Sequence, residues 1–561
     1  MSSTDDTPDV ALPLDQLLTQ AGMGSARRFL PGGAGVRFVG ALARRPSRVA
    51  TRLSGLAGEL GRITLGVSDV APQRRDRRFA DPAWTGNPIY RRIMQSYLAT
   101  SEMAEGLVQD IPMGWQDAER MKFVVANIVE AASPSNNPLL TPVALKAFID
   151  SGGANAVRGP RNLVRDLSTS PRVPSMVDPD AYEVGTDLAV TPGKVVHRSP
   201  MFEVIQYTPQ TEKVREVPLL IVPPTINKYY VLDLAPGRSL VEYLVQQGQQ
   251  VFVMSWRNPE AQHSKWGFDA YCQGIIDAFD VVDQISGVGR AHAVAACSGG
   301  MLACLAAAHR AAEGKLDRLA SLSLLVTMID QRQAGTAGAL MDRDIAAQAV
   351  ARSRRKGYLD GRDLAEVFAW LRPGDLIWNY WVNNYLQGKT PPKFDILYWN
   401  ADTTRMTAKL HRDFVDAGLQ NHLATPGAVE VLGTPIDLSR IEVDSYVVAG
   451  SADHLCPWKN CYRSSQLLGG TTRFVLSTSG HIAALVNPPG NPKASFQWSE
   501  DSSIDAEDWR QEATLEQGSW WPDYAAWLGE RSGKKKAAPT SLGSAEHQPK
   551  EDAPGTYVLD S

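Results

Sequence analysis

The sequence predicts an α/β fold in which a largely parallel sheet is covered by helices on both faces. From about residue 181, short apolar runs rich in β-branched residues alternate with segments of helical periodicity. This alternation is typical of parallel sheets whose crossover helices pack on the two faces. A glycine-containing turn at residues 296–300 follows one of these runs, at the edge where such sheets place their functional sites.

The expected core elements follow one another in regular order. Strands are predicted at residues 202–207, 218–222, 250–254, 292–295 and 321–326. Helical patterns separate the last four of these strands, at residues 239–247, 271–285 and 301–312. After an interruption, two further strands are predicted at residues 443–448 and 473–476.

The chain of 561 residues is long enough for more than one domain. The arginine-rich residues 1–75 are expected to form a basic arm, either flexible in solvent or lying on an apolar or anionic surface. The expected order is this arm, a mostly helical domain, the first part of the core, an aromatic-rich cap inserted over the site, the second part of the core, and a disordered tail. The boundaries are 1–75, 76–180, 181–330, 331–440, 441–532 and 533–561.

Composition excludes several classes of protein. A net charge of -4 argues against a nucleic-acid-binding protein. No apolar run of about 18 residues predicts a transmembrane helix, and the first residues lack the features of a secretory signal. The five cysteines form an odd, sparse set that suits a reducing cytoplasm, and their spacing predicts no zinc site.

Residues 291–302 carry the strongest candidate for chemistry. An apolar run ends at Cys297, two glycines follow, and a helical segment begins. This is the layout of the nucleophile elbow of α/β hydrolases, G-x-S-x-G, with a thiol as nucleophile and Ala295 in place of the first glycine. The alternative is a buried, inert cysteine beside a glycine-rich turn.

Two later residues complete a possible triad. α/β hydrolases place the nucleophile, the acid and the histidine in that order along the chain. Asp453 and His481 follow the late strands in this order. Each also has a plainer interpretation, Asp453 as a turn or capping residue and His481 as a histidine that satisfies a loop backbone group.

An oxyanion hole requires two backbone N–H groups. The residue after the nucleophile, Ser298, supplies one, and the proline-containing loop at residues 222–230 is the candidate for the second, near Ile226. A rigid connecting loop is the alternative interpretation of this segment. A cysteine nucleophile suits acyl transfer from coenzyme A at least as well as hydrolysis, because thiols and thioesters exchange with little change in free energy.

Several longer segments together resemble one protein family. They occur at residues 223–230, 233–234, 255–259, 266–267, 296–300, 399–405, 453–454, 457–458 and 480–482. With these segments the chain resembles the bacterial polyhydroxyalkanoate synthases, most closely the medium-chain-length type, class II. The resemblance runs from about residue 79 to residue 532.

The resemblance implies an α/β-hydrolase fold and a polymerase that joins (R)-3-hydroxyacyl units from coenzyme A thioesters into polyester. It places the nucleophile at Cys297, the base at His481 and the acid at Asp453, which either orients His481 or activates the substrate hydroxyl. It implies no cofactor, the release of coenzyme A, a homodimer, and a cytoplasmic location at the polyester granule surface. The alternatives are a cysteine esterase or thioesterase on the same fold, or a non-catalytic granule-surface protein.

Overall fold

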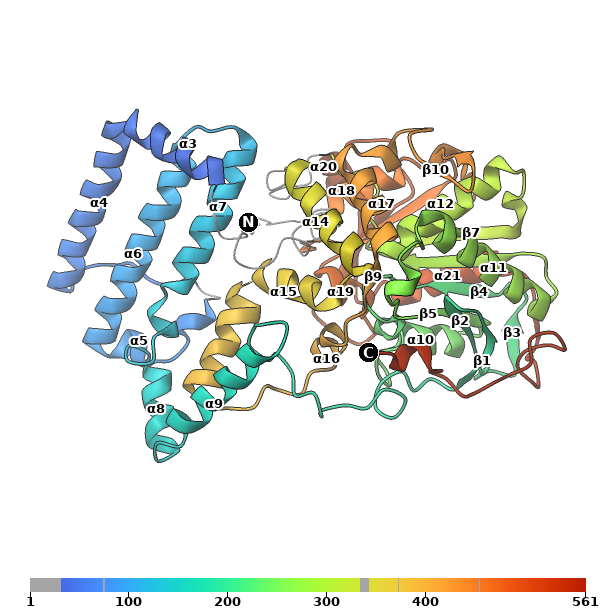
Figure 1. Ribbon diagram of the computed structural model, residues 1–561, viewed down its shortest axis with the longest axis horizontal. Coiled ribbons are helices and arrows are strands. Elements are labelled where there is room, and N and C mark those ends of the chain that lie inside the picture. Colours follow the sequence, from blue (N-terminus) through green and yellow to red (C-terminus); the bar gives the residue numbers. More distant parts are fainter. Residues whose placement is uncertain (1–31, 74–75, 333–342, 372, 454) are drawn as a thin grey trace.

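The computed structural model describes residues 32–73, 76–332, 343–371, 373–453 and 455–561. Figure 1 shows a group of helices on one side, in blue and cyan, and a larger α/β region on the other. The first 31 residues of the expected basic arm lie outside the described part of the chain.

A ten-stranded sheet forms the centre of the α/β region. Its order is β1-β2-β5-β4-β6-β7-β12-β13-β14-β15. The pairs between β5 and β13 are parallel, whereas β1, β2, β14 and β15 pair antiparallel at the two edges. The strands span Gly193–Arg198, Phe202–Tyr207, Val251–Trp256, Leu219–Val222, Ala291–Ala296, Leu319–Leu325, Ser445–Gly450, Thr472–Ser477, Ser495–Ser499 and Thr514–Gln517, in sheet order. The predicted α/β class is confirmed.

Both faces of the sheet are buried, which explains the nearly continuous apolar strands. Along β6, Ala293 and Ala295 join one hydrophobic cluster, whereas Val294 and Ala296 join the cluster on the opposite face. The first cluster contains residues of α11, α12, α17, α18 and α20, and the second contains residues of α10, α19 and α21. These helices span Phe268–Ser286, Ser298–Ala312, Ala408–Leu419, Trp458–Ser465, Ala506–Glu512, Leu240–Gln246, His481–Leu485 and Trp521–Arg531.

The N-terminal helices form a separate layer. They are α3 to α9, spanning Gly32–Ala43, Pro46–Leu65, Ala83–Gly86, Pro88–Asp110, Trp115–Ala131, Pro142–Asp150 and Asn155–Ser168. Residues 32–65, expected within a flexible arm, instead form α3 and α4. Their arginines pair with acids of the neighbouring helices, Arg37 with Asp117 at 2.5 Å and Arg52 with Asp110 at 2.7 Å. These partners are distant in sequence, so the local charge pattern did not reveal them.

The aromatic part of the expected cap packs mainly against this helical layer. The helical turn η7 (Trp381–Leu386) lies beside α9 and α8, and η6 (Gly374–Trp378) contacts α7. The Trp381 indole donates to the Asn136 carbonyl at 3.0 Å, and the Tyr385 hydroxyl donates to Asp166 at 2.9 Å. An added Cβ at Gly159 would lie 1.9 Å from the Tyr385 carbonyl oxygen, so the two backbones approach closely only because this residue is glycine.

The remaining part of the insertion returns to the core. Helix α16 (Asp395–Ala401) places the Trp399 indole within 2.8 Å of the Lys228 carbonyl, on the loop after β4. Tyr398 and Ile396 of this helix pack on the same hydrophobic cluster as Cys297. The insertion also contains α14 (Arg343–Lys356), β8 (Tyr358–Leu359), α15 (Gly361–Leu371), β9 (Met406–Thr407), α17, β10 (Glu430–Val431) and β11 (Thr434–Pro435).

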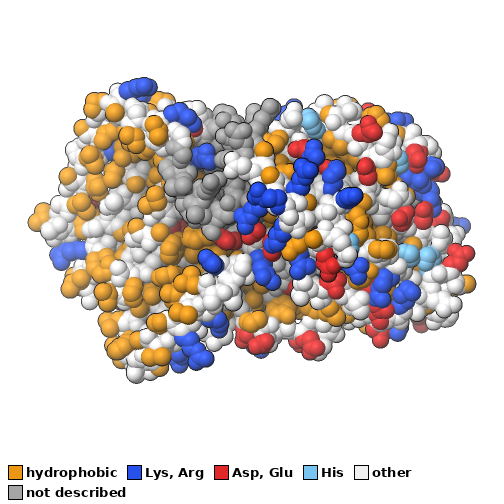
Figure 2. Space-filling model, viewed as in Figure 1, with side chains coloured by type: hydrophobic (Ala, Val, Ile, Leu, Met, Phe, Trp, Pro, Cys, Tyr) orange, Lys and Arg blue, Asp and Glu red, His pale blue; other side chains and the backbone are white. Residues whose placement is uncertain are grey.

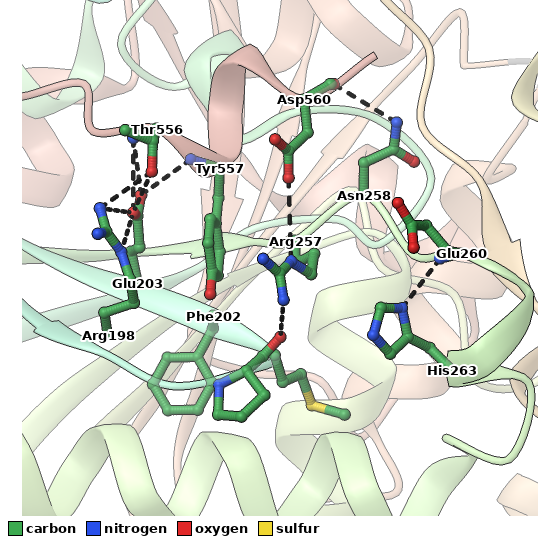
Figure 3. Close-up of polar contacts among 12 residues, drawn as sticks. Arg198, Phe202, Glu203, Arg257, Asn258, Glu260, His263, Thr556, Tyr557 and Asp560 are labelled. Atoms are coloured by element: carbon green, nitrogen blue, oxygen red, sulfur yellow. Dashed lines mark hydrogen bonds and ion pairs between the residues drawn. The ribbon is translucent and has the colours of Figure 1, made fainter.

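The segment after α21 is folded, contrary to the disorder expected from its composition. Strand β16 (Lys535–Ala537) pairs with β3 (Lys213–Arg215). Further on, the backbone N–H groups of Thr556 and Tyr557 each donate to the Glu203 carboxylate at 3.2 Å (Figure 3). Glu203 is fully buried on β2. A buried carboxylate requires hydrogen-bond donors. The backbone N–H groups of this segment supply them, and these hydrogen bonds hold the segment in place although its composition is polar.

Candidate active site

Cys297 stands between the end of β6 and the start of α12, in a strained backbone conformation with φ 50 and ψ -122. The glycines that follow allow the turn to pack closely. An added Cβ at Gly299 would lie 2.3 Å from the Pro223 carbonyl oxygen, and one at Gly300 would lie 2.1 Å from Thr327 Oγ1. Ala295 is fully buried in β6, and the sharp turn forms although this position departs from the expected glycine.

His481 and Asp453 follow neighbouring parallel strands, β13 and β12. His481 Nδ1 lies 2.7 Å from Asp453 Oδ2. The other carboxylate oxygen of Asp453 accepts the backbone N–H groups of Leu455 at 2.8 Å and Cys456 at 2.9 Å. Both side chains are buried, and these contacts fix the carboxylate, which in turn fixes the orientation of the imidazole ring.

The structure brings the three predicted triad residues together and places a further cysteine, Cys456, beside them. The ligand atoms of Cys297, Cys456 and His481 lie within 4.8 Å of one another. Since His481 Nδ1 faces Asp453, its Nε2 is the nitrogen available to the thiols. Sequence reasoning missed Cys456, because it stands on a loop with no elbow and nothing in its local pattern indicates that it approaches Cys297.

The charges of the site favour a thiolate. A hydrogen bond from the Cys456 thiol, helped by the His481 ring and the Ser298 N–H, lowers the pKa of Cys297 against the opposing effect of burial. Burial alone lowers the pKa of His481, but the Asp453 carboxylate and the Cys297 thiol outweigh it and raise that pKa. The pKa of Cys456 is raised by its contact with Cys297 and by burial. The arrangement therefore supports one activated thiol beside a protonated imidazole.

This electrostatic arrangement predicts the pH dependence of Cys297 alkylation. A thiolate reacts with iodoacetamide, and its fraction falls only when the pH drops below the thiol pKa. Because the pKa of Cys297 is lowered, the alkylation rate should stay high at neutral pH and decline only in acid. Mass spectrometry of the alkylated peptide, followed across pH, measures this rate.

The buried Cys272 and Cys304 provide the internal comparison. Burial raises the pKa of both thiols, so they should be alkylated far more slowly than Cys297 at every pH tested. If Cys297 alkylation instead rose only at alkaline pH, as for an ordinary thiol, the thiolate assignment would be wrong.

Of the two predicted oxyanion residues, Ser298 lies at the elbow turn and Ile226 lies on the loop after β4. The Ser298 N–H faces the Cys297 sulfur, and the Ser298 hydroxyl accepts the Thr225 N–H at 2.9 Å, which ties the loop after β4 to the elbow. Ile226 is buried in this loop, and its carbonyl accepts the Thr404 hydroxyl at 2.5 Å. The participation of the Ile226 N–H in an oxyanion hole stays a prediction.

A thiol on a strand-to-helix elbow, with its histidine and acid on loops after later parallel strands, is the site arrangement of the α/β-hydrolase fold. A family model described as the alpha/beta hydrolase fold matches residues 218–488. Among the described helices, none is long and apolar enough to cross a lipid bilayer.

A second family model, the N-terminus of poly-beta-hydroxybutyrate polymerase (PhaC), matches residues 75–244. The chain is 46% identical to poly(3-hydroxyalkanoate) polymerase 2 of Ectopseudomonas oleovorans over 92% of each chain. It is 44% identical to polymerase 1 of that organism, again over 92% of each chain. The polymerase subunit PhaC of Cupriavidus necator is 39% identical over 88% of this chain and 84% of its own. The chain therefore belongs to the poly(3-hydroxyalkanoate) polymerase family, and the resemblance to the class II type is confirmed.

Proposed function

We propose that this protein polymerises (R)-3-hydroxyacyl units from coenzyme A thioesters into polyester, through an acyl group carried on Cys297. The observation that carries the proposal is the placement of an elbow thiol beside a histidine that is itself held by Asp453, in a chain of the polymerase family. This arrangement is the one that nucleophilic acyl transfer requires.

In the first step, the Cys297 sulfur attacks the carbonyl carbon of the coenzyme A thioester. His481 Nε2 holds the proton that the thiol gives up, and the Ser298 N–H donates to the developing oxyanion, with a second N–H near Ile226. The new bond joins the acyl carbon to Cys297. The bond to the coenzyme A sulfur breaks, and the departing thiolate takes the proton from His481.

In the second step, the 3-hydroxyl of another acyl unit attacks the thioester on Cys297. An ester bond forms, the bond to the Cys297 sulfur breaks, and the hydroxyl proton passes to His481. Base catalysis of this kind typically contributes about 10²–10⁴-fold in rate. No cofactor is required, because the thioester itself supplies the activated acyl group.

The decisive experiment supplies purified protein with (R)-3-hydroxyacyl-coenzyme A and measures free coenzyme A, insoluble polyester and free hydroxy acid. Polymer that accumulates in step with coenzyme A release supports the proposal. Free acid without polymer would indicate a cysteine esterase or thioesterase, and no turnover at all would indicate a non-catalytic granule protein.

We further propose that the helical layer contacts the polyester granule in the cytoplasm, and that the chain works as a homodimer. Most of the exposed large hydrophobic side chains among the described residues lie between residues 36 and 167. Figure 2 shows hydrophobic side chains gathered over these helices, whereas charged side chains are more frequent over the α/β region. An exposed apolar surface of this extent is typical of a binding face, and a polyester surface matches its chemistry.

Replacing Leu139, Phe148 and Ile149 together by serine should weaken binding to isolated polyester granules by at least about tenfold, because burying each such side chain contributes about 1.5–3 kcal/mol. All three are exposed. Co-sedimentation with granules measures the effect, and size-exclusion chromatography with light scattering reports the oligomeric state. A matched control replaces the exposed Leu515 and Leu559 of the α/β region. Equal loss of binding in both variants would contradict the assignment of the surface.

A further inference from the structure

Three potential metal ligands meet at the elbow although they are far apart in sequence. Cys297 follows β6, Cys456 follows β12 and His481 begins α19. Their ligand atoms lie within 4.8 Å of one another. The linear spacing of the cysteines indicates no zinc site, since a spacing pattern detects only ligands that share one short segment.

The separations are close to those that a tetrahedral zinc ion requires. With Zn–S near 2.3 Å and Zn–N near 2.0–2.1 Å, two sulfur ligands lie about 3.8 Å apart, and a sulfur and a nitrogen about 3.6 Å apart. Because these ligand atoms all lie within 4.8 Å of one another, binding a single ion requires each pair to approach by at most about 1 Å. Two cysteines and one histidine are also the ligand set of a known type of zinc site with an open fourth position.

The surroundings favour a metal ion as well. Asp453 holds His481 Nδ1 at 2.7 Å, which leaves Nε2 directed at the thiols. In zinc sites, the ring nitrogen of a histidine that does not bind the ion commonly donates a hydrogen bond to a carboxylate, which fixes the orientation of the ring. Thiolate and imidazole ligands select zinc, cadmium and related soft cations over magnesium and calcium.

We propose that Cys297, Cys456 and His481 form an inhibitory binding site for Zn²⁺ and similar thiophilic cations. Binding releases two protons to solvent, the thiol proton of Cys456 and the single proton shared by Cys297 and His481, because all three ligand atoms must be deprotonated to bind the ion. The bound ion occupies the lone pair that Cys297 needs for attack on a thioester and the nitrogen that His481 needs for proton transfer. The metal site stands independently of the proposed function, whereas the inhibition rests on it.

Cobalt binding tests the site without any enzymatic assay. Titration of Co²⁺ into the full chain, kept reduced with a phosphine, should produce a saturable thiolate-to-cobalt absorption band that Zn²⁺ abolishes and Mg²⁺ does not. In Cys456→Val the dissociation constant for Co²⁺ should rise by at least about 100-fold. Removing a residue that only hydrogen-bonds a metal ligand lowers metal affinity by about 10–100-fold, and removing a ligand itself should lower it more. No saturable band, or an unchanged one in Cys456→Val, would overturn the proposal.

Two comparisons separate loss of a ligand from loss of folding. Cys304→Ala removes a buried thiol of α12 outside the ligand set and should retain the cobalt band. Zn²⁺ should raise the melting temperature of the unmodified chain and of Cys304→Ala but not of Cys456→Val, because only a protein that binds the ion in its folded state is stabilised by it. An equal rise in Cys456→Val would contradict the site.

The inhibition is measured separately as coenzyme A release from (R)-3-hydroxyacyl-coenzyme A. Zn²⁺ should inhibit this release reversibly, with activity restored by a chelator, and at least about 100-fold more Zn²⁺ should be needed in Cys456→Val than in Cys304→Ala. A saturable cobalt band together with undiminished release in Zn²⁺ would overturn the inhibitory role. Absence of all turnover, with the band present, would contradict the polymerase function and leave the metal site standing.

Discussion

Replacing Cys297 by alanine should reduce coenzyme A release and polymer formation by at least about 10⁴-fold, which is the scale of loss when the nucleophile of a triad is removed. Among the cysteines in the described part of the chain, Cys297 alone combines the elbow position with a neighbouring histidine. The variant lacks the atom that carries the acyl group, so neither the first step nor chain growth can proceed. Steady-state release of coenzyme A and the mass of insoluble polyester measure the loss.

The matched control is Cys272→Ala, which removes a buried thiol of α11 far from the elbow in sequence and outside the cluster of Cys297 and His481. It should retain most of the activity. Rapid-mixing experiments with the unmodified chain should also show an acyl group covalently attached to Cys297. Substantial polymer formation by Cys297→Ala would refute the assignment of the nucleophile.

Asp453→Asn should lower polymer formation by about 10²–10⁴-fold through the tautomer of His481. One carboxylate oxygen of Asp453 accepts two backbone N–H groups, so an asparagine would keep its oxygen there and direct its NH₂ group at His481 Nδ1. That contact stabilises the ring with its proton on Nε2. A ring in this form cannot accept the proton of Cys297.

This substitution also separates the two roles open to Asp453. If Asp453 orients His481, alkylation of Cys297 at neutral pH and polymer formation should fall together in Asp453→Asn. If Asp453 acts on the substrate hydroxyl, alkylation and the first release of coenzyme A should persist while chain growth stops. The hydrogen bond between Asp453 and His481 leads us to expect the first result. Unchanged polymer formation would remove Asp453 from the site.

The sequence was most informative where a local pattern and the tertiary structure agree. The strands β4, β6 and β12 are buried throughout because both faces of the sheet are covered, so their mostly apolar sequences alone revealed them. The edge strands β15 and β16 are exposed or only half-buried, and neither has an apolar run to indicate it. Their pairing depends on neighbours that the local sequence does not contain.

The same distinction applies to the site. Cys297, Asp453 and His481 could be proposed because the fold fixes their order along the chain. Cys456 has no such ordering rule, and its contact with Cys297 exists only once the sheet brings the ends of β6 and β12, with β7 between them, to the same edge. The segment after α21 was likewise judged by its polar composition, whereas its order comes from the buried Glu203 of β2.

The packing of η7 against α9 has a consequence for building chimeras between related polymerases. Residues of the two helical segments are joined by Asn155 Nδ2, which donates to the Leu386 carbonyl at 2.9 Å, and by the close backbone approach at Gly159. A crossover placed after residue 180 would combine one parent's N-terminal helices with the other parent's η6 and η7. The exchangeable unit is therefore discontinuous, and a graft that preserves this interface must carry residues 374–386 together with the N-terminal helices.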